Sequence, residues 1–194
     1  MPAEPRLLAF AGSARAGSHN RRLVQAAARA AGAQGAAVTL AELRDFPMPL
    51  YDGDLESSQG MPEAAYRFRQ LMAEHDGFLI ASPEYNSSLA PLLKNTIDWA
   101  SRSHPADQGP APAFRGKVAG LMSASPGRLG GIRGLPHLRQ VLTTLGVLVA
   151  AEQLALPNAA EAFAEDGSLK EASHARMLES LVARVATLAA KLKA

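Results

Sequence analysis

The sequence predicts an α/β fold: a doubly wound, five-stranded parallel sheet with helices on both faces. Two observations predict it. Short apolar runs without polar alternation are typical of parallel strands covered on both sides, and segments with apolar residues at helical spacing separate these runs. Strands that alternate with helices pair in parallel through right-handed crossovers. At 194 residues the chain can bury the core of one domain, so we expect residues 1–194 to form a single domain.

The strands are expected where the apolar runs occur. The clearest runs are residues 7–11, 78–81, 118–122 and 147–150, and residues 37–41 form a weaker candidate. In chain order these strands suit the flavodoxin-like sheet order 2-1-3-4-5. In such a sheet ligands bind outside the carboxyl ends of the strands, where the strand order reverses. We therefore expect the chemistry in the loops after the first, third and fourth strands.

Each expected helix carries one apolar stripe. The stripes are Leu23, Val24, Ala27 and Ala31; Ala65, Phe68, Met72 and His75; Leu135, Leu138, Leu142 and Leu145; and Leu178, Leu181, Val185, Leu188 and Leu192. Two connections, residues 44–61 and 103–116, are long. Long loops in compact domains are often binding or lid elements.

Composition narrows the class of protein. The net charge of +2 and the scattered basic residues predict no nucleic-acid partner. The chain has no cysteine, which excludes disulfides and thiolate chemistry, and its histidines show no metal-ligand spacing, so no metal is expected. No apolar run is long enough for a signal peptide or a membrane span. We expect a cytoplasmic protein.

The loop after the first strand, residues 12–20, combines small residues with hydrogen-bond donors. Ser13, Ser18 and Asn20 can donate to phosphate oxygens, Arg15 offers a charge-assisted contact, and the start of the following helix favours an anion. In a simpler interpretation Ser18 only caps the helix, although three donors and an arginine exceed what capping requires. A lysine after Gly17 and a G-x-G-x-x-G pattern are both missing, which favours a monophosphate ligand.

The loop after the third strand, residues 82–88, reads S-P-E-Y-N-S-S. Pro83 stiffens the exit of the strand, Tyr85 offers a flat surface, and Asn86 supplies both a donor and an acceptor. This set suits the edge of a planar heterocycle. It is equally compatible with an ordinary turn in which Tyr85 is half buried.

Taken together, the motifs G-S-x-R-x-x-S-x-N and S-P-E-Y-N-x-S, followed by L-K-N-x-I-D-W, resemble those of NAD(P)H-dependent FMN reductases. This flavodoxin-like family includes quinone, chromate and azo-dye reductases. The resemblance implies that FMN is the cofactor, that NADPH or NADH donates hydride, and that a quinone-like small molecule accepts it in a ping-pong scheme. It also implies a homodimer or homotetramer.

The resemblance further implies FMN-binding residues in all three loops. They are Ser13, Arg15, Ser18, His19 and Asn20 in the first loop, Pro83, Glu84, Tyr85 and Asn86 in the second, and Ser125 and Gly127 in the third. His19 stands where relatives often have an aromatic residue, so packing or a surface contact is expected of it rather than acid catalysis. Ala90-Pro91 stands where many relatives have Pro-Gly, which moves the rigid point of the loop.

No catalytic residue is expected, because the flavin itself carries the hydride chemistry. Backbone N–H groups of residues 84–86 and 125–127, if aimed at the flavin, would favour its reduced form. Arg128 and Arg133 either meet the 2′-phosphate of NADPH or form a solvated basic surface. Two alternatives to an enzyme stay open: a flavin-binding regulatory protein, and a non-catalytic electron carrier, which the net charge of +2 disfavours because such carriers are typically acidic.

Overall fold

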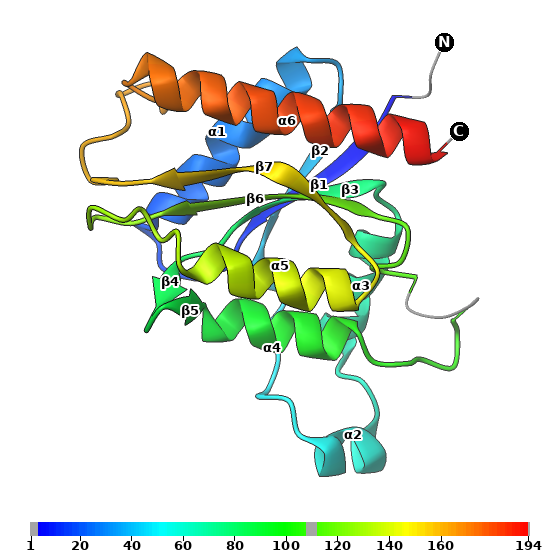
Figure 1. The fold of residues 1–194 in the computed structure, drawn as a ribbon. Helices are drawn as coiled ribbons and strands as arrows, with labels where there is room; N and C mark the ends of the chain where they lie inside the picture. The colour runs from blue at the N-terminus through cyan, green and yellow to red at the C-terminus, as the bar shows by residue number, and fades with distance from the viewer. Residues whose placement is uncertain (1–3, 108–111, 194) are drawn as a thin grey trace.

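A computed structural model describes residues 4–107 and 112–193 of the chain. Its main sheet has five parallel strands in the order β2-β1-β3-β6-β7 (Figure 1). The strands are β1 (Arg6–Ala11), β2 (Ala37–Glu42), β3 (Gly77–Ala81), β6 (Val118–Ala124) and β7 (Leu148–Leu156). Because β6 and β7 are the fourth and fifth strands of this sheet, the predicted order 2-1-3-4-5 is confirmed.

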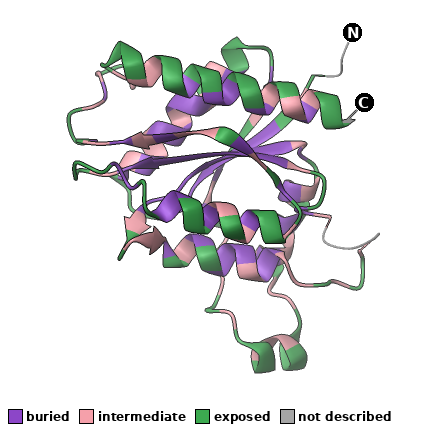
Figure 2. Cartoon of the chain, viewed as in Figure 1, coloured by how far each residue is buried: buried purple, intermediate pink, exposed green. Residues whose placement is uncertain are grey.

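Helices cover both faces of the sheet, as predicted (Figure 1). On one face lie α1 (His19–Ala33) and α6 (Ala172–Lys193), and on the other α3 (Glu63–Ala73), α4 (Pro91–Ala100) and α5 (Gly134–Thr144). Successive residues of β1 alternate between the two cores: Leu7 packs in the cluster of α1 and α6, and Leu8 in the cluster of α3, α4 and α5. The central strands β1, β3 and β6 are therefore buried on both sides, as Figure 2 shows, while the edge strands β2 and β7 are partly exposed.

The elements differ from the sequence expectation in several details. The last strand continues to Leu156, since it lies at an edge of the sheet and tolerates polar residues that hide its pattern. Helix α3 ends at Ala73, so His75 leaves the expected stripe. It is buried in the turn that follows, with Nε2 2.8 Å from the Thr39 hydroxyl. Leu192 is 54% exposed and does not extend the stripe of α6.

The long connection 44–61 forms an arm that stands away from the sheet (Figure 1). It contains the short helix α2 (Gly53–Gln59), which buries none of its residues, and follows a 3-10 turn at Leu43–Asp45. Helix α4 fastens the base of this arm: Asn95 and Trp99 both donate hydrogen bonds to the Pro49 carbonyl, at 2.9 and 2.8 Å. The arm is thus anchored at its base and exposed at its tip.

The second long connection, 103–116, joins the end of α4 to the start of β6, so it lies at the amino ends of the strands. Two contacts hold its first part against α3. Arg69 and Asp107 form an ion pair, and the rings of His104 and Tyr66 are stacked with their centroids 4.0 Å apart. The rest of the expected loop includes residues 108–111, which lie outside the described residues. Between residues 4 and 193, leaving out 108–111, no helix is long and apolar enough to cross a membrane.

Candidate functional site

The loops after β1, β3 and β6 meet at the carboxyl edge of the sheet and enclose a cavity of about 260 Å³. This is the edge at which ligands bind in doubly wound folds. The cavity is lined by Ser13, Arg15, Ser18, His19, Asn20, Pro83, Glu84, Tyr85, Ala124, Ser125 and Pro126. Nine of the eleven residues predicted to bind the cofactor are among them; Asn86 and Gly127 are not.

The first loop leaves hydrogen-bond donors facing the cavity. Ser18 is the N-cap of α1 and its hydroxyl oxygen accepts from the Arg21 amide, so capping and a site for an anion coexist. The amides of His19 and Asn20, in the first turn of the helix, have no intrahelical acceptor. Arg15 is exposed, and its guanidinium makes no hydrogen bond or ion pair with any described residue. These groups suit an anion.

The imidazole of His19 also lines this end of the cavity. Burial, and then the charges of Arg15 and Arg22, hold the pKa of His19 below its usual value. Its Nδ1 atom is buried without a hydrogen-bond partner among the described residues. A negatively charged ligand here would oppose the repulsion from both arginines.

The second loop is a tight hairpin of β4 (Glu84–Tyr85) and β5 (Ser88–Leu89), two strands too short to be recognised in the sequence. Its central residues Asn86 and Ser87 have φ angles of 50° and 64°, which is the type I′ turn geometry that matches the twist of a hairpin. Asn86 therefore serves the turn. Tyr85 lines the cavity and is 54% exposed, so its burial is compatible with both interpretations of this loop.

Glu84 turns its carboxylate away from solvent and onto the start of α5. One oxygen accepts from Arg133 Nε and Nη2 at 2.8 and 2.6 Å, and the other from the backbone amides of Arg133 and Gly134 at 2.8 and 3.1 Å. Burial alone would raise the pKa of Glu84, but these hydrogen bonds and the Arg133 charge lower it overall. Arg133 is therefore engaged by Glu84, which argues against its predicted alternative role at a 2′-phosphate.

Asn20 is also engaged within the protein. Its side-chain amide donates to the Ala124 carbonyl and accepts from the Ala124 amide, both at 2.9 Å. The contact joins the first turn of α1 to the end of β6. Asn20, which was expected to donate to phosphate, lines the cavity, and its side chain also connects the first and third loops.

The third loop is held close to the sheet by glycines. Gly130 and Gly131 have φ angles of 62° and 84°, and a Cβ atom on Gly131 would lie 2.0 Å from the buried Ser123 hydroxyl. Two amides expected to face a flavin are used inside the loop region: Ser125 N–H donates to the Leu156 carbonyl and Gly127 N–H to the Ser125 hydroxyl, both at 3.1 Å. These two amides therefore already have acceptors within the protein.

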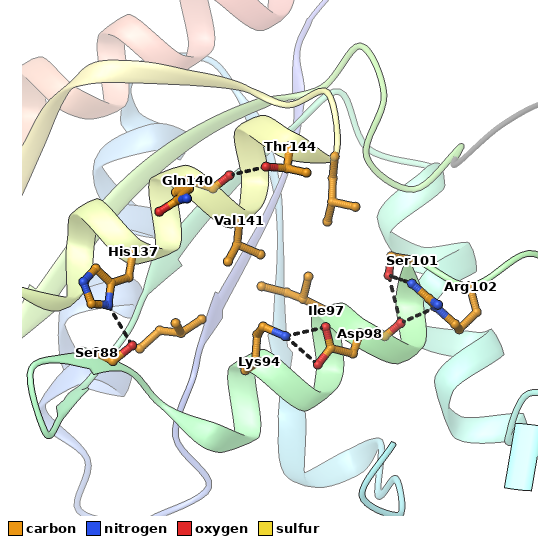
Figure 3. Close-up of a pocket in the computed structure, with 12 residues that line it drawn as sticks. Ser88, Lys94, Ile97, Asp98, Ser101, Arg102, His137, Gln140, Val141 and Thr144 are labelled. Carbon is orange, nitrogen blue, oxygen red and sulfur yellow. Dashed lines mark hydrogen bonds and ion pairs between the residues drawn. The ribbon is translucent and has the colours of Figure 1, made fainter. Parts of the chain in front are cut away.

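A second cavity, of about 520 Å³, lies between α4 and α5 (Figure 3). Several of its polar groups pair with one another: Lys94 Nζ bridges both Asp98 carboxylate oxygens at 2.8 Å, and His137 Nδ1 lies 2.9 Å from the Ser88 hydroxyl. The smaller cavity has the unpaired arginine and the convergent loops, so we take it as the candidate site.

Comparison with known proteins decides the family. Residues 5–161 match the model of the NADPH-dependent FMN reductase family. The chain belongs to this FMN reductase family. An NAD(P)H-dependent FMN reductase of Pseudomonas aeruginosa is 41% identical over 142 residues, which are 73% of this chain and 71% of the relative.

Two further similarities extend over greater lengths of the chain. An NAD(P)H:quinone oxidoreductase of Solanum tuberosum is 34% identical over 198 residues, covering 100% of this chain and 98% of the relative. The solved structure of the flavoenzyme NAD(P)H:acceptor oxidoreductase of Paracoccus denitrificans superposes with a TM-score of 0.81 at 26% identity, covering 96% of this chain and 98% of that one. The resemblance identified from the motifs is therefore confirmed.

The sequence of this FMN reductase family member did not reveal how its loops are fastened together. Arg133 and Gly134 support the second loop, and Ala124 supports the first, yet each partner is 49 to 104 residues away in the chain. Only the run of glycines at 130–131 signalled a constrained third loop. The residue types at the motif positions indicated which residues line the cavity. They did not indicate which partners the Asn20 and Glu84 side chains would have.

Proposed function

We propose that the cavity at the carboxyl edge of the sheet binds FMN and that the protein is an NAD(P)H-dependent reductase of quinone-like acceptors. The observation that carries this proposal is the meeting of nine predicted cofactor residues around one cavity. Family membership and relatives named FMN reductase and quinone oxidoreductase support the same activity.

The residues present fit the chemistry of FMN. A monophosphate needs donors and positive charge, and the unpaired Arg15 guanidinium, the hydroxyls of Ser13 and Ser18, and the free amides at the start of α1 offer both. Tyr85 and Pro83 of the second loop offer flat apolar surface to a planar ring. His19, whose Nδ1 atom is buried without a hydrogen-bond partner among the described residues, lines the same cavity.

FMN, when bound, supplies the hydride chemistry between NAD(P)H and the acceptor. The chain's own residues bind and orient it. Arg15 and the start of α1 fix the phosphate end, while the hairpin of β4 and β5 presents Tyr85 to the ring system. Since half of Tyr85 stays exposed, the site remains open to two substrates in turn, as a ping-pong scheme requires.

The cofactor preference rests on Arg128. It is exposed in the third loop and has no hydrogen bond or ion pair among the described residues, whereas Arg133 is committed to Glu84. We propose that an NADPH preference, if measured, comes from Arg128. An unchanged ratio of kcat/KM for NADPH and NADH in Arg128→Ala would remove this assignment.

The proposed activity is tested in two steps. The purified protein, or its cofactor-free form supplied with FMN, should turn yellow and quench the fluorescence of added FMN. The loaded protein should then oxidise NADPH or NADH continuously when a benzoquinone is present. A protein that binds FMN but stops after one turnover would be an electron carrier or a regulatory protein, and one that takes up no FMN would refute the whole proposal.

We also infer that the protein assembles as a homodimer or homotetramer. The arm supports this, because its helix α2 buries none of its own residues and Leu50 beside it is 81% exposed. Light scattering after size-exclusion chromatography measures the mass directly. A monomer at micromolar concentration would contradict the inference without affecting the proposed reaction.

A further inference from the structure

The cavity is bounded by loops that come from different strands, and its width therefore depends on what holds those loops together. The second loop contributes Pro83, Glu84 and Tyr85 to one wall, and the third contributes Ser125 and Pro126 to another. Glu84 is the residue that links these walls, through its four hydrogen bonds to Arg133 and Gly134.

We infer that Glu84 is a positioning residue for the proposed flavin site: with Arg133 as its counter-charge, it fixes the spacing of the second and third loops and keeps the wall beside the ring system electrically neutral. The inference rests on the proposed function. It assigns to Glu84 a role different from direct contact with the flavin, since both carboxylate oxygens are already occupied by donors from the protein.

Burial explains why the linkage is strong. The Glu84 side chain is only 8% exposed, so its carboxylate has little water to replace a lost donor, whereas Arg133 is 56% exposed and bends over it from the surface. Two of the four hydrogen bonds come from the backbone at the start of α5, where the helix dipole also favours a negative charge. Arg133, as N-cap, supplies no side-chain cap of its own, and the Glu84 carboxylate takes that place from across the cleft.

The backbone around the Glu84 contact is closely packed. A Cβ atom on Gly134 would lie 3.0 Å from the Ser88 carbonyl oxygen, and one on Gly131 would press on Ser123. The third loop can therefore approach the hairpin only because these positions carry glycine. A change in the Glu84 contact is transmitted to both walls of the cavity.

The effect of each charge on the midpoint potential of bound FMN distinguishes this role from a merely structural one. Glu84→Gln removes the negative partner and leaves Arg133 unbalanced, while Arg133→Met removes the positive partner and leaves a buried carboxylate beside the site. A two-electron-reduced flavin gains negative charge, so the midpoint potential of bound FMN should rise in Glu84→Gln and fall in Arg133→Met. Loss of shape alone would not move the two potentials in opposite directions.

The experiment measures FMN affinity and midpoint potential in the wild type, the two single variants, the double variant and Arg133→Lys. We expect each single substitution to weaken FMN binding about tenfold, because a buried charged group loses its partner. The potentials should shift with opposite signs, return toward the wild-type value in the double variant, and recover in Arg133→Lys. Arg184→Met, which removes an arginine of similar exposure from its ion pair with Glu152, away from the cavity, is the control and should leave FMN affinity within about twofold.

The outcomes separate the two proposals. If the wild-type protein binds no FMN, the proposed function falls and this inference falls with it. If the wild type binds FMN and the single variants bind it equally well, or if their potentials shift in the same direction, the proposed function stands and the role of Glu84 is refuted.

Discussion

Asn20 and Ala124 exchange two hydrogen bonds of 2.9 Å across 104 residues of sequence. The side chain of Asn20 thereby acts as a backbone partner for the last residue of β6, at the point where that strand leaves the sheet. Both residues are buried, with exposures of 3% and 4%. The first and third loops are consequently fixed to each other before any ligand binds.

Replacing Asn20 with alanine should destabilise the ligand-free protein by about 2–4 kcal/mol, since the buried N–H and C=O groups of Ala124 lose their partners together. Urea unfolding measures the change. Gln70→Ala, which removes an exposed amide from α3, is the control and should change the free energy of unfolding by less than about 0.5 kcal/mol. Equal effects of the two substitutions would contradict the role given to Asn20.

Arginine 15 should distinguish FMN from riboflavin. Its guanidinium faces the cavity without a protein partner, so Arg15→Ala should raise the Kd for FMN about ten- to a hundredfold by removing a charge-assisted hydrogen bond. Riboflavin lacks the phosphate, and its Kd should not change. Parallel fluorescence titrations with both flavins provide the measurement, and an equal loss for both would place Arg15 elsewhere than at the phosphate.

Serine 87 carries backbone strain that glycine would relieve. Its φ of 64° lies in the left-handed region, which costs a non-glycine residue about 1 kcal/mol. Ser87→Gly should therefore raise the thermal midpoint of the FMN-free protein. Asn86→Gly, at φ 50°, should have a smaller effect because asparagine tolerates this conformation. A lower midpoint for Ser87→Gly would show that the serine hydroxyl matters more than the strain.

Mild acid should destabilise the FMN-free protein through His19. Its pKa is lowered on folding by burial and by Arg15 and Arg22, so below about pH 6.5 the unfolded chain takes up the proton more readily than the folded one. The stability that neutral His19 provides is thus complete above this pH and is lost as the pH falls toward the lower folded value.

The effect of His19 is expected to stay below about 1 kcal/mol, because solvent screens a partly exposed group. Urea unfolding at pH 7.5 and 5.5 should show a smaller loss in His19→Gln than in the wild type. The same comparison with FMN bound should show a reduced difference, since the phosphate offsets the repulsion from the arginines. Identical pH profiles for the two proteins would exclude His19 as the source.

The strands and most helices could be predicted because each depends on local patterns. Residues such as Leu7 and Leu8 lie in an unbroken apolar run, and burial on both faces of the sheet is the physical reason for that run. The second half of β7 escaped prediction, because Glu152 and Gln153 occupy an edge strand where the pattern is mixed. The hairpin escaped because Ser87, rather than glycine, holds its second left-handed position.

The residues of the candidate site could be predicted from its motifs, but the hydrogen bonds that join its loops could not. Asn20 and Glu84 were expected to contact the cofactor, and the sequence offers no signal that their side chains bond to Ala124 and Arg133. Such contacts arise only when the sheet brings loops from different strands to one edge. The helix α2 was missed for a local reason: its sequence G-D-L-E-S-S-Q has no apolar stripe.

The arm between β2 and α3 also offers a practical handle. Ser58 lies exposed on α2, away from both cores, and the chain contains no cysteine. A single cysteine introduced at this position would be the only thiol in the molecule, so a maleimide dye or a spin label could be attached there in one defined copy per chain. Distances between such labels would report directly on how copies of the protein are arranged in solution.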